Sequence, residues 1–394
     1  MWQSIDRLRE SVGMVDTTDS TALVLSGGGA RASYQAGVLQ YITDNLSLDD
    51  LDIVTGVSAG SINAGKLANN TVGYREAIAE LLTCWAELGP DDVYEAASSL
   101  SVMMSMLKRS SNEDQELLPR AGLVDTTPLL GYLNKVMGTP DGRLSGIGEN
   151  IQKGRLKACA FVSTEYATGQ TVSWIEGKSI EGWERPNRIS RQTHLTTDHI
   201  MASSSLPFLF PAIKIQDRWY GDGGIRQAEP LSPAVHLGAT KILAISTRYG
   251  RSIEEASRPV SEGYPPAAQI FSVLLNAVFL DRLDQDAALL MKINELVKDL
   301  APWKRRGLRN IEMLIIRPSQ DLGKLSGDFQ NELSGVLGLI ARGLGSKDTK
   351  SPDWLSMILF DSEYTSKLIE VGYSDARRER DRLARFFEKS TSGR

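Results

Sequence analysis

The distribution of apolar and polar positions near the start of the chain predicts two buried strands, each followed by a helix. Residues 21–25 form a continuous apolar run, which favours a strand buried on both faces. Residues 34–42 repeat apolar positions at helical spacing, a second apolar run begins at 51, and helix-favouring residues follow at 61–68. A strand–helix–strand order requires a crossover, so these two strands should lie parallel in one sheet.

Helices and hairpins are predicted for the rest of the chain. Helices are expected at 74–88, 96–108, from 127, from 196 to 205, at 230–237 and 267–300, and strands at 156–164, 170–175, 212–215, 218–220, 241–246 and 310–316. The charged stretch 176–195 is predicted to be a loop. We therefore expect a three-layer α/β/α fold with a mostly parallel central sheet and a helical C-terminal elaboration.

The pattern changes near residue 250 and predicts three parts. Residues 1–20 are polar and are interpreted as an N-terminal leader, residues 21–250 as the core, and residues 251–394 as a mainly helical region packed on the same domain. The strand predicted at 310–316 favours this single domain, because it can rejoin the same sheet.

Composition and charge exclude several classes of protein. Hydrophobic residues make up 41% and charged residues 24% of the chain, which is typical of a soluble globular protein. A net charge of −5 gives no basic face for nucleic acid. Cys84 and Cys159 are the two cysteines, with no Cys/His cluster, which argues against a disulfide framework and a zinc site. We see no secretory signal and no apolar run of ~18 residues, and expect a cytoplasmic protein without metal or organic cofactor.

The turn that follows the second strand carries the first candidate for chemistry. It reads Gly56-Val57-Ser58-Ala59-Gly60, and its two glycines suit a turn too tight for side chains. Ser58 is expected to stand exposed at a helix N-terminus, where free N–H groups favour developing negative charge. This pattern predicts a catalytic nucleophile, but it is short enough to arise by chance, and a plain Gly-Ser loop is the alternative.

A serine nucleophile needs oxyanion donors and a base. The glycine run Gly27–Gly29 follows the first strand and can turn its N–H groups into one concavity. The candidate bases are Asp222, flanked by glycines after a predicted strand and expected to be exposed to the cleft, and the three histidines His194, His199 and His236. The last two fall within predicted helices, which favours structural roles for them.

Four motifs occur in a fixed order over roughly residues 20–250. They are Ser26-Gly27-Gly28-Gly29-Ala30-Arg31, Gly56-Val57-Ser58-Ala59-Gly60, Ala202-Ser203-Ser204-Ser205-Leu206-Pro207 and Asp222-Gly223-Gly224. Together they resemble the patatin-like phospholipase family.

The resemblance implies a Ser58–Asp222 dyad, in which Asp222 accepts and returns the serine proton. It implies an oxyanion hole made by the Gly27, Gly28 and Gly29 backbone with Ala30 and Arg31 beside it. The substrate would be a lipid ester such as a phospholipid or lysophospholipid, cleaved through an acyl-serine intermediate. Ala32 stands where the family usually has glycine, so we expect the loop to enter its helix one residue earlier. The Arg31 side chain is interpreted either as a headgroup contact or as a salt bridge that fixes the loop.

Two other interpretations stay open. Ser58, Asp222 and His236 occur in the order of an α/β-hydrolase triad, which would make the protein a triad esterase or an acyltransferase. The pattern Gly27-x-Gly29-x-x-Ala32, with acidic residues at 49–52, also fits a loose dinucleotide fingerprint, so a non-catalytic lipid- or nucleotide-binding module is the third interpretation.

A lipid hydrolase should contact a membrane peripherally, and two stretches are candidates for this contact. Leu333–Ile340, followed by Arg342 and Lys347, can form an interfacial amphipathic helix. Trp303–Arg306 combines an aromatic ring with local positive charge. An ordinary core helix and a solvated basic turn are the respective alternatives. The sequence gives no indication of an oligomeric state.

Overall fold

The computed structural model describes the chain in several stretches. These are residues 20–46, 51–96, 122–257, 264–265, 267–280, 282–327, 329 and 353–388. Apart from its first residue, the helix predicted at 96–108 lies outside them, as does the candidate membrane stretch at 333–340. Within these residues, no helix is both long enough and apolar enough to cross a membrane.

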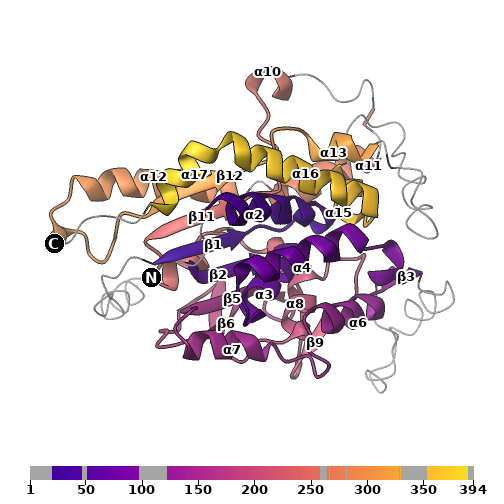
Figure 1. Ribbon diagram of the computed structural model, residues 1–394, viewed down its shortest axis with the longest axis horizontal. Helices are drawn as coiled ribbons and strands as arrows, with labels where there is room; N and C mark the ends of the chain where they lie inside the picture. The colour runs from indigo at the N-terminus through magenta and orange to yellow at the C-terminus, as the bar shows by residue number, and fades with distance from the viewer. Residues whose placement is uncertain are drawn as a thin grey trace.

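A ten-stranded sheet forms the centre of the described structure (Figure 1). Its strands are β1 (Thr21–Leu25), β2 (Leu51–Val57), β5 (Ala158–Glu165), β6 (Thr171–Gly177), β7 (Glu184–Arg185), β8 (Arg188–Gln192), β9 (Ile213–Ile215), β10 (Arg218–Asp222), β11 (Lys241–Ile245) and β12 (Glu312–Ile316). Their order is β12-β11-β1-β2-β5-β6-β8-β7, with β10 pairing to β5 and β9. The run from β12 to β5 is parallel throughout. A separate pair is formed by β3 (Glu95–Ala96) and β4 (Val124–Asp125).

Helices surround this sheet. The α-helices are α2 (Ser33–Asn45), α3 (Ala59–Asn69), α4 (Tyr74–Glu87), α6 (Thr127–Val136), α7 (Ser145–Gln152), α8 (Thr197–Ser204), α9 (Ser232–His236), α10 (Ile253–Ala256), α11 (Ala267–Leu275), α12 (Arg282–Lys298), α13 (Leu322–Leu325), α15 (Asp353–Ile358), α16 (Ser362–Arg378) and α17 (Arg380–Phe387). Short 3-10 turns are η1 (Gly29–Ala32), η2 (Pro90–Asp92), η3 (Gly223–Ile225) and η5 (Pro302–Lys304), and η4 (Asn276–Leu280) is a π-helical turn.

Strand β1 shows why both faces of the sheet are covered. Leu23 and Leu25 belong to a hydrophobic cluster shared with α2, whereas Ala22 and Val24 belong to a second cluster shared with α9 and α12. Successive side chains of a strand point to opposite faces, so a continuous apolar run can be buried only between two helical layers. The expected three-layer α/β/α fold with a mostly parallel sheet is confirmed.

One edge of β5 is shared by two strands that approach from opposite directions. β2 runs parallel to β5, and its last pair joins Val57 to Val162. β10 runs antiparallel to β5, and its last pair joins Asp222 to Ser163, the residue after Val162. Since β6 occupies the other edge of β5 along this length, β2 and β10 must meet on the same edge. The turn after β2 and the end of β10 therefore converge at one point.

The C-terminal part of the chain adds to the fold in two places. β12 extends the sheet by pairing in parallel with β11, and α16 lies along α2 (Figure 1). The two helices approach closely, because a Cβ on Gly37 would lie 2.0 Å from the Ile369 carbonyl oxygen and a Cβ on Gly372 2.1 Å from the Tyr34 carbonyl oxygen. The boundary at residue 250 stays a prediction.

Most of the predicted elements are confirmed, with ends that differ by a few residues. The loop predicted at 176–195 is wrong, because this stretch contains β7 and β8. Arg188–Gln192 forms a strand whose side chains are half-buried or exposed. A strand in such a position needs no apolar run, so it has no hydrophobic signature to recognise.

We predict that Gly372→Ala destabilises the protein by about 3 kcal/mol, because the added methyl group would collide with the backbone of α2. Gly131→Ala is the matched control: Gly131 lies in α6 with no heavy atom within 4 Å of an added Cβ, and this change should stabilise the protein by about 0.5–1 kcal/mol. Denaturant unfolding of both variants measures the difference. Equal stability of the two would show that the α2–α16 contact is not close.

Candidate active site

Ser58 lies in a strained turn between β2 and α3. Its φ of 54° and ψ of −137° lie outside the regions that side-chain-bearing residues normally adopt. The turn packs directly on the first strand, since a Cβ on Gly60 would lie 2.3 Å from the Leu25 carbonyl oxygen. Gly56 is equally crowded, because a Cβ there would lie 2.4 Å from the Gly60 carbonyl oxygen. The expected strand–turn–helix is therefore present, and its two glycines are required by close backbone approach.

Serine hydroxyls from α8 and α3 fix the backbone of this turn. Ser58 N donates to Ser203 Oγ at 3.0 Å, and Ser203 Oγ donates to the Val162 carbonyl at 2.6 Å. Ser204 Oγ and Ser61 Oγ donate to the Ser58 carbonyl at 2.9 and 2.6 Å. The Ala202–Pro207 motif was recognised in the sequence, but this supporting role was not. These bonds hold Ser58 in a conformation that it would otherwise avoid.

Asp222, the last residue of β10, is held in the sheet by its backbone. Its N–H donates to the Ser205 carbonyl at 2.9 Å, and its carbonyl accepts from Thr164 Oγ1 at 2.9 Å. The side-chain Oδ1 accepts from Gly224 N at 2.8 Å. The other oxygen, Oδ2, is buried and has no hydrogen-bond partner among the described residues. One oxygen of this carboxyl is thus fixed, and the other is left available.

Burial changes the acid strength of this carboxyl. Asp222 is 0% exposed, and this desolvation raises its pKa from 3.8 to about 7. The Ser58 hydroxyl and the Gly224 N–H act in the opposite direction and lower the pKa. The hydroxyl is therefore near the carboxyl, although it forms no hydrogen bond to Oδ2 that meets normal geometric limits.

The expectation that Ser58 and Asp222 are exposed to a cleft is wrong. Ser58 is only 2% exposed and Asp222 is fully buried. Phe279 contributes to this cover, because a Cβ on Gly224 would lie 2.4 Å from its ring. The sequence could not show this, since the covering residue lies more than 50 positions away.

The glycine loop after β1 lies against Ser58. A Cβ on Gly27 would lie 2.9 Å from Ser58 Cβ and 3.6 Å from Ser58 Oγ. Gly29 has a φ of +57°, and a Cβ there would lie 1.8 Å from the Met357 carbonyl oxygen. Gly28, with a φ of +153°, packs on Thr247. The backbone N–H groups of Gly28 and Gly29 donate to no described residue.

A buried polar network, which sequence analysis missed, holds the entry to this loop. Gln35 Nε2 donates to the Ser26 carbonyl at 2.8 Å. Asn63 Nδ2 donates to Gln35 Oε1 at 2.9 Å and to the Ala32 carbonyl at 3.0 Å. Trp85 Nε1 donates to Asn63 Oδ1 at 2.8 Å. Buried polar side chains with satisfied partners of this kind rigidify the backbone that they bind.

Arg31 turns away from Ser58 and into the protein. Its guanidinium donates to Asp353 Oδ1 at 2.7 Å and to Ser356 Oγ at 2.7 Å, and all three side chains are buried. Of the two interpretations offered above, the structure shows the salt bridge. Ala30 is also buried within η1. Ala32 has helical angles, φ −65° and ψ −16°, so the loop enters its helix early, as expected.

The three histidines make contacts that suit structural roles. His199 Nδ1 accepts from Thr196 N at 3.1 Å, and burial lowers the pKa of His199 to about 4. His236 stacks on Trp183 with ring centroids 4.7 Å apart, in the layer that covers the opposite face of the sheet from α2. His194 is exposed and contacts Glu176. No hydrogen bond joins any of them to Ser58 or Asp222 in the described structure.

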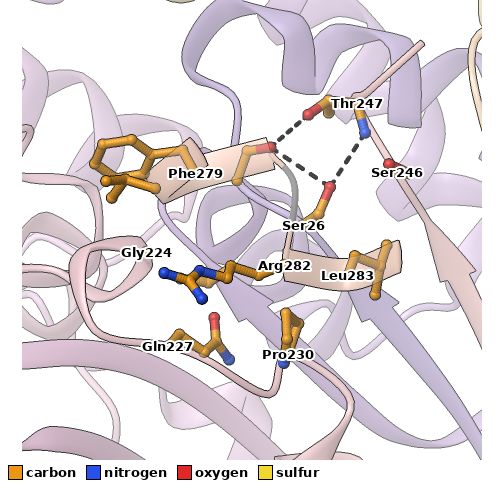
Figure 2. Close-up of a pocket in the computed structure, with 12 residues that line it drawn as sticks. Ser26, Gly224, Gln227, Pro230, Ser246, Thr247, Phe279, Arg282 and Leu283 are labelled. Atoms are coloured by element: carbon orange, nitrogen blue, oxygen red, sulfur yellow. Dashed lines mark hydrogen bonds between the residues drawn. The ribbon is translucent and has the colours of Figure 1, made fainter. Parts of the chain in front are cut away.

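A pocket opens beside the glycine loop (Figure 2). Its lining residues are Ser26, Gly27, Val57, Gly224, Gln227, Pro230, Ser246, Thr247, Val278, Phe279, Arg282 and Leu283. On one wall, Thr247 Oγ1 donates to the Gly27 carbonyl and Thr247 N donates to Ser26 Oγ at 3.2 Å. Further lining residues come from η4 and the start of α12. The pocket adjoins Ser58 through its chain neighbour Val57 and through Gly27. In the part of the chain described, no group of three or more His, Cys, Asp or Glu side chains is placed to hold a metal ion.

The fold is a three-layer α/β/α domain in which the Ser58 turn and the end of β10 at Asp222 converge. The chain belongs to the patatin-like phospholipase family, whose family model matches residues 23–235, more than half of the chain. The resemblance that the four motifs indicated is thereby confirmed. A search of curated protein sequences finds no match.

Similar solved structures include three larger proteins. VipD from Legionella pneumophila is 12% identical with a TM-score of 0.40, over 93% of this chain and 67% of its own. Human GIVD cytosolic phospholipase A2 with methyl gamma-linolenyl fluorophosphonate is 11% identical with a TM-score of 0.42, and the match covers 98% of this chain and 63% of that protein. The type III effector ExoU of Pseudomonas aeruginosa is 15% identical with a TM-score of 0.30, over 87% and 54%. At these values we draw no conclusion on function from the similarities.

The raised pKa of Asp222 predicts how the stability of the protein changes with pH. Between about pH 4 and 7 the folded protein holds a proton that the unfolded chain has released, so this contribution is fully present below pH 4 and is lost as the pH rises through about 7. Asp222→Asn removes the ionisation, and should stabilise the protein by up to about 4 kcal/mol at pH 8 and far less at pH 4. Urea unfolding of both proteins at the two pH values measures this. The exposed Asp217→Asn is the control, and a less stable Asp222→Asn at pH 8 would contradict the prediction.

Proposed function

We propose that the protein hydrolyses lipid esters through an acyl-Ser58 intermediate, with Asp222 as the group that accepts and returns the proton. The observation that carries the proposal is the Asp222 carboxyl: it is buried beside the Ser58 turn, one of its oxygens has no described partner, and its pKa is about 7. A base with a pKa near the working pH can both take up and release a proton efficiently.

In the first half of the proposed reaction, Ser58 Oγ attacks the ester carbonyl carbon and its proton passes to Asp222 Oδ2. The bond from that carbon to the alcohol oxygen then breaks, and Asp222 returns the proton to the departing alcohol. In the second half, water attacks the acyl carbon and gives a proton to Asp222. The bond to Ser58 Oγ breaks, the proton returns to that oxygen, and the fatty acid leaves.

The glycine loop is the proposed oxyanion hole. The Gly28 and Gly29 N–H groups have no described acceptor, and Gly27 lies against the Ser58 side chain. A preorganised donor of this kind is worth about 3–4 kcal/mol to a tetrahedral intermediate. Ser58 also stands at the N-terminus of α3, whose dipole favours negative charge there. Ala30 and Arg31 take a supporting part, through the buried ion pair of Arg31 with Asp353.

The proposed substrates are phospholipids or lysophospholipids. Val57, Val278, Phe279 and Leu283 place apolar side chains in the lining of the pocket beside Ser58, although its cavity of about 20 Å³ has room for only about one water molecule. The observations disfavour the two alternatives. A triad through His236 would need that ring near Asp222, whereas it stacks on Trp183. A dinucleotide site would need an acidic side chain at the end of the second strand, where the Ser58 turn stands.

We predict that Ser58→Ala and Asp222→Asn each lower ester turnover by about 10³-fold or more, because each removes a group that the reaction requires. His236→Ala should keep turnover within about threefold of the wild type, since this ring contacts neither of the two. Turnover is measured by mass spectrometry on a lipid panel, together with labelling of Ser58 by a fluorophosphonate probe. Unlabelled Ser58 in folded protein without ester turnover would reject the enzyme, and loss of activity only in His236→Ala would favour the triad.

The pH dependence of the rate provides a separate test. Only the ionised Asp222 can accept the serine proton, so kcat/KM should rise about tenfold per pH unit below pH 7 and level off above it. The measurement uses a soluble short-chain ester between pH 5 and 9, with circular dichroism to confirm that the protein stays folded. A rate that is flat across this range would contradict the role of Asp222.

A further inference from the structure

The segment 267–280, which covers α11 and η4, has its polar side chains on the inside. It contains no charged residue, and its polar residues are Gln269, Ser272 and Asn276. Ser272 is buried and its Oγ accepts from Trp354 N at 3.4 Å. Asn276 Nδ2 donates to Asp353 Oδ2 at 2.7 Å. Two of the three polar residues therefore bind α15, in the interior of the protein.

The outer face of α11 is apolar. Ile270, Val273 and Leu274 stand at i, i+3 and i+4 and are 46, 57 and 58% exposed. A surface helix in water normally has the opposite arrangement, with charged or polar residues outside and apolar residues inside. Single exposed apolar residues need no explanation, but an uncharged helix that turns an apolar stripe outward indicates an apolar neighbour.

This stripe continues directly into the wall of the pocket. Val278 and Phe279 of η4 and Arg282 of α12 line the pocket beside Gly27 (Figure 2). The apolar face of α11 is thus followed directly in the chain by residues that line the pocket. A ligand that comes from an apolar phase at α11 would reach the pocket lining at η4. Arg282 is exposed and forms no ion pair within the described structure. A free cation at the edge of an apolar stripe suits a surface that carries anionic headgroups.

The inner side of the segment 267–280 is connected to the glycine loop through Asn276 of η4. Asp353 Oδ2 accepts from Asn276, and Asp353 Oδ1 accepts from Arg31, which is in the loop itself. The segment that carries the apolar stripe thus shares a buried carboxylate with the proposed oxyanion hole.

We infer that the exposed face of α11 docks on a lipid surface, with Ile270, Val273 and Leu274 in the apolar boundary and Arg282 at the headgroups. The inference deepens the proposed function and rests on it, because an enzyme that acts on lipids needs to bind a lipid surface. An interfacial helix gains free energy from the apolar area that it buries and from attraction to anionic lipid. The face of α11 differs from both membrane-contact stretches predicted from the sequence. Residues 333–340 lie outside the described residues, and Trp303, although exposed, belongs to η5, which follows the C-terminal end of α12.

The test measures binding without catalysis. Full-length Ser58→Ala protein is floated with vesicles of phosphatidylcholine alone and of phosphatidylcholine with phosphatidylglycerol. We expect it to bind, more tightly to the anionic vesicles. Adding Leu274→Asp should weaken partitioning at least about tenfold, because a charge then replaces a side chain that is buried in the boundary. Adding Arg282→Gln should reduce the preference for phosphatidylglycerol.

Leu296→Asp is the matched control. Leu296 is 66% exposed near the C-terminal end of α12, about 20 Å along the helix from Arg282, and the same substitution there should leave vesicle binding unchanged. Thermal unfolding of every variant checks the fold, and Leu274→Ser replaces Leu274→Asp if the latter does not fold. Absence of flotation, or equal loss in the two Asp variants, would overturn the inference.

Two outcomes separate this inference from neighbouring ones. If the chain self-associates in light scattering and Leu274→Asp abolishes that association but not flotation, then the stripe binds a second copy and the inference is wrong. If wild-type protein binds vesicles but Ser58 is not labelled by fluorophosphonate, then the docking surface stands and the proposed function fails.

Discussion

The edge of β5 is the constraint on which the site depends. β2 occupies this edge up to Val162, and β10 occupies it from Ser163 onward in the opposite direction. Backbone pairing along one strand thus sets the position of the Ser58 turn relative to Asp222. A displacement of β10 by one residue would turn its side chains to the opposite face of the sheet and remove Asp222 from the turn. The meeting of two strands, rather than any loop, brings these side chains together.

This arrangement has an energetic cost that other parts of the fold must offset. Ser58 has an unfavourable backbone conformation, and Asp222 is buried with one oxygen unpaired. Such features persist only where their surroundings over-determine them. Here the hydroxyls of Ser203 and Ser204 fix the turn, and the Gln35–Asn63–Trp85 network fixes the neighbouring loop. The hydrogen bonds around the site therefore offset the cost of its strained backbone and of its buried carboxyl.

The sequence was informative where local chemistry decides the structure. Gly60 lies two residues from Ser58, and the run Gly27–Gly29 follows the first strand directly, so the turn, the glycine loop and the parallel strands could be predicted from local patterns. Partners far apart in the chain could not be predicted. Arg31 binds Asp353, which is 322 residues away in the sequence. Burial raises the pKa of Asp222, and nothing in the sequence next to Asp222 indicates this burial. The strand at Arg188–Gln192 was missed for a related reason, because it is only half-buried.

Asp353 lies in the C-terminal region, outside the four motifs, and yet it contacts the candidate site. One carboxylate oxygen holds Arg31 of the glycine loop, and the other holds Asn276 of the segment that carries the apolar stripe. Burial acts to raise the pKa of Asp353, but Arg31, the Asn276 amide and Arg251 together outweigh it and lower the pKa, so the carboxylate stays charged at neutral pH. Removing one partner of such a buried pair leaves an uncompensated charge, which costs about 3–5 kcal/mol. One buried carboxylate of the C-terminal region therefore contacts both the glycine loop beside Ser58 and the segment 267–280.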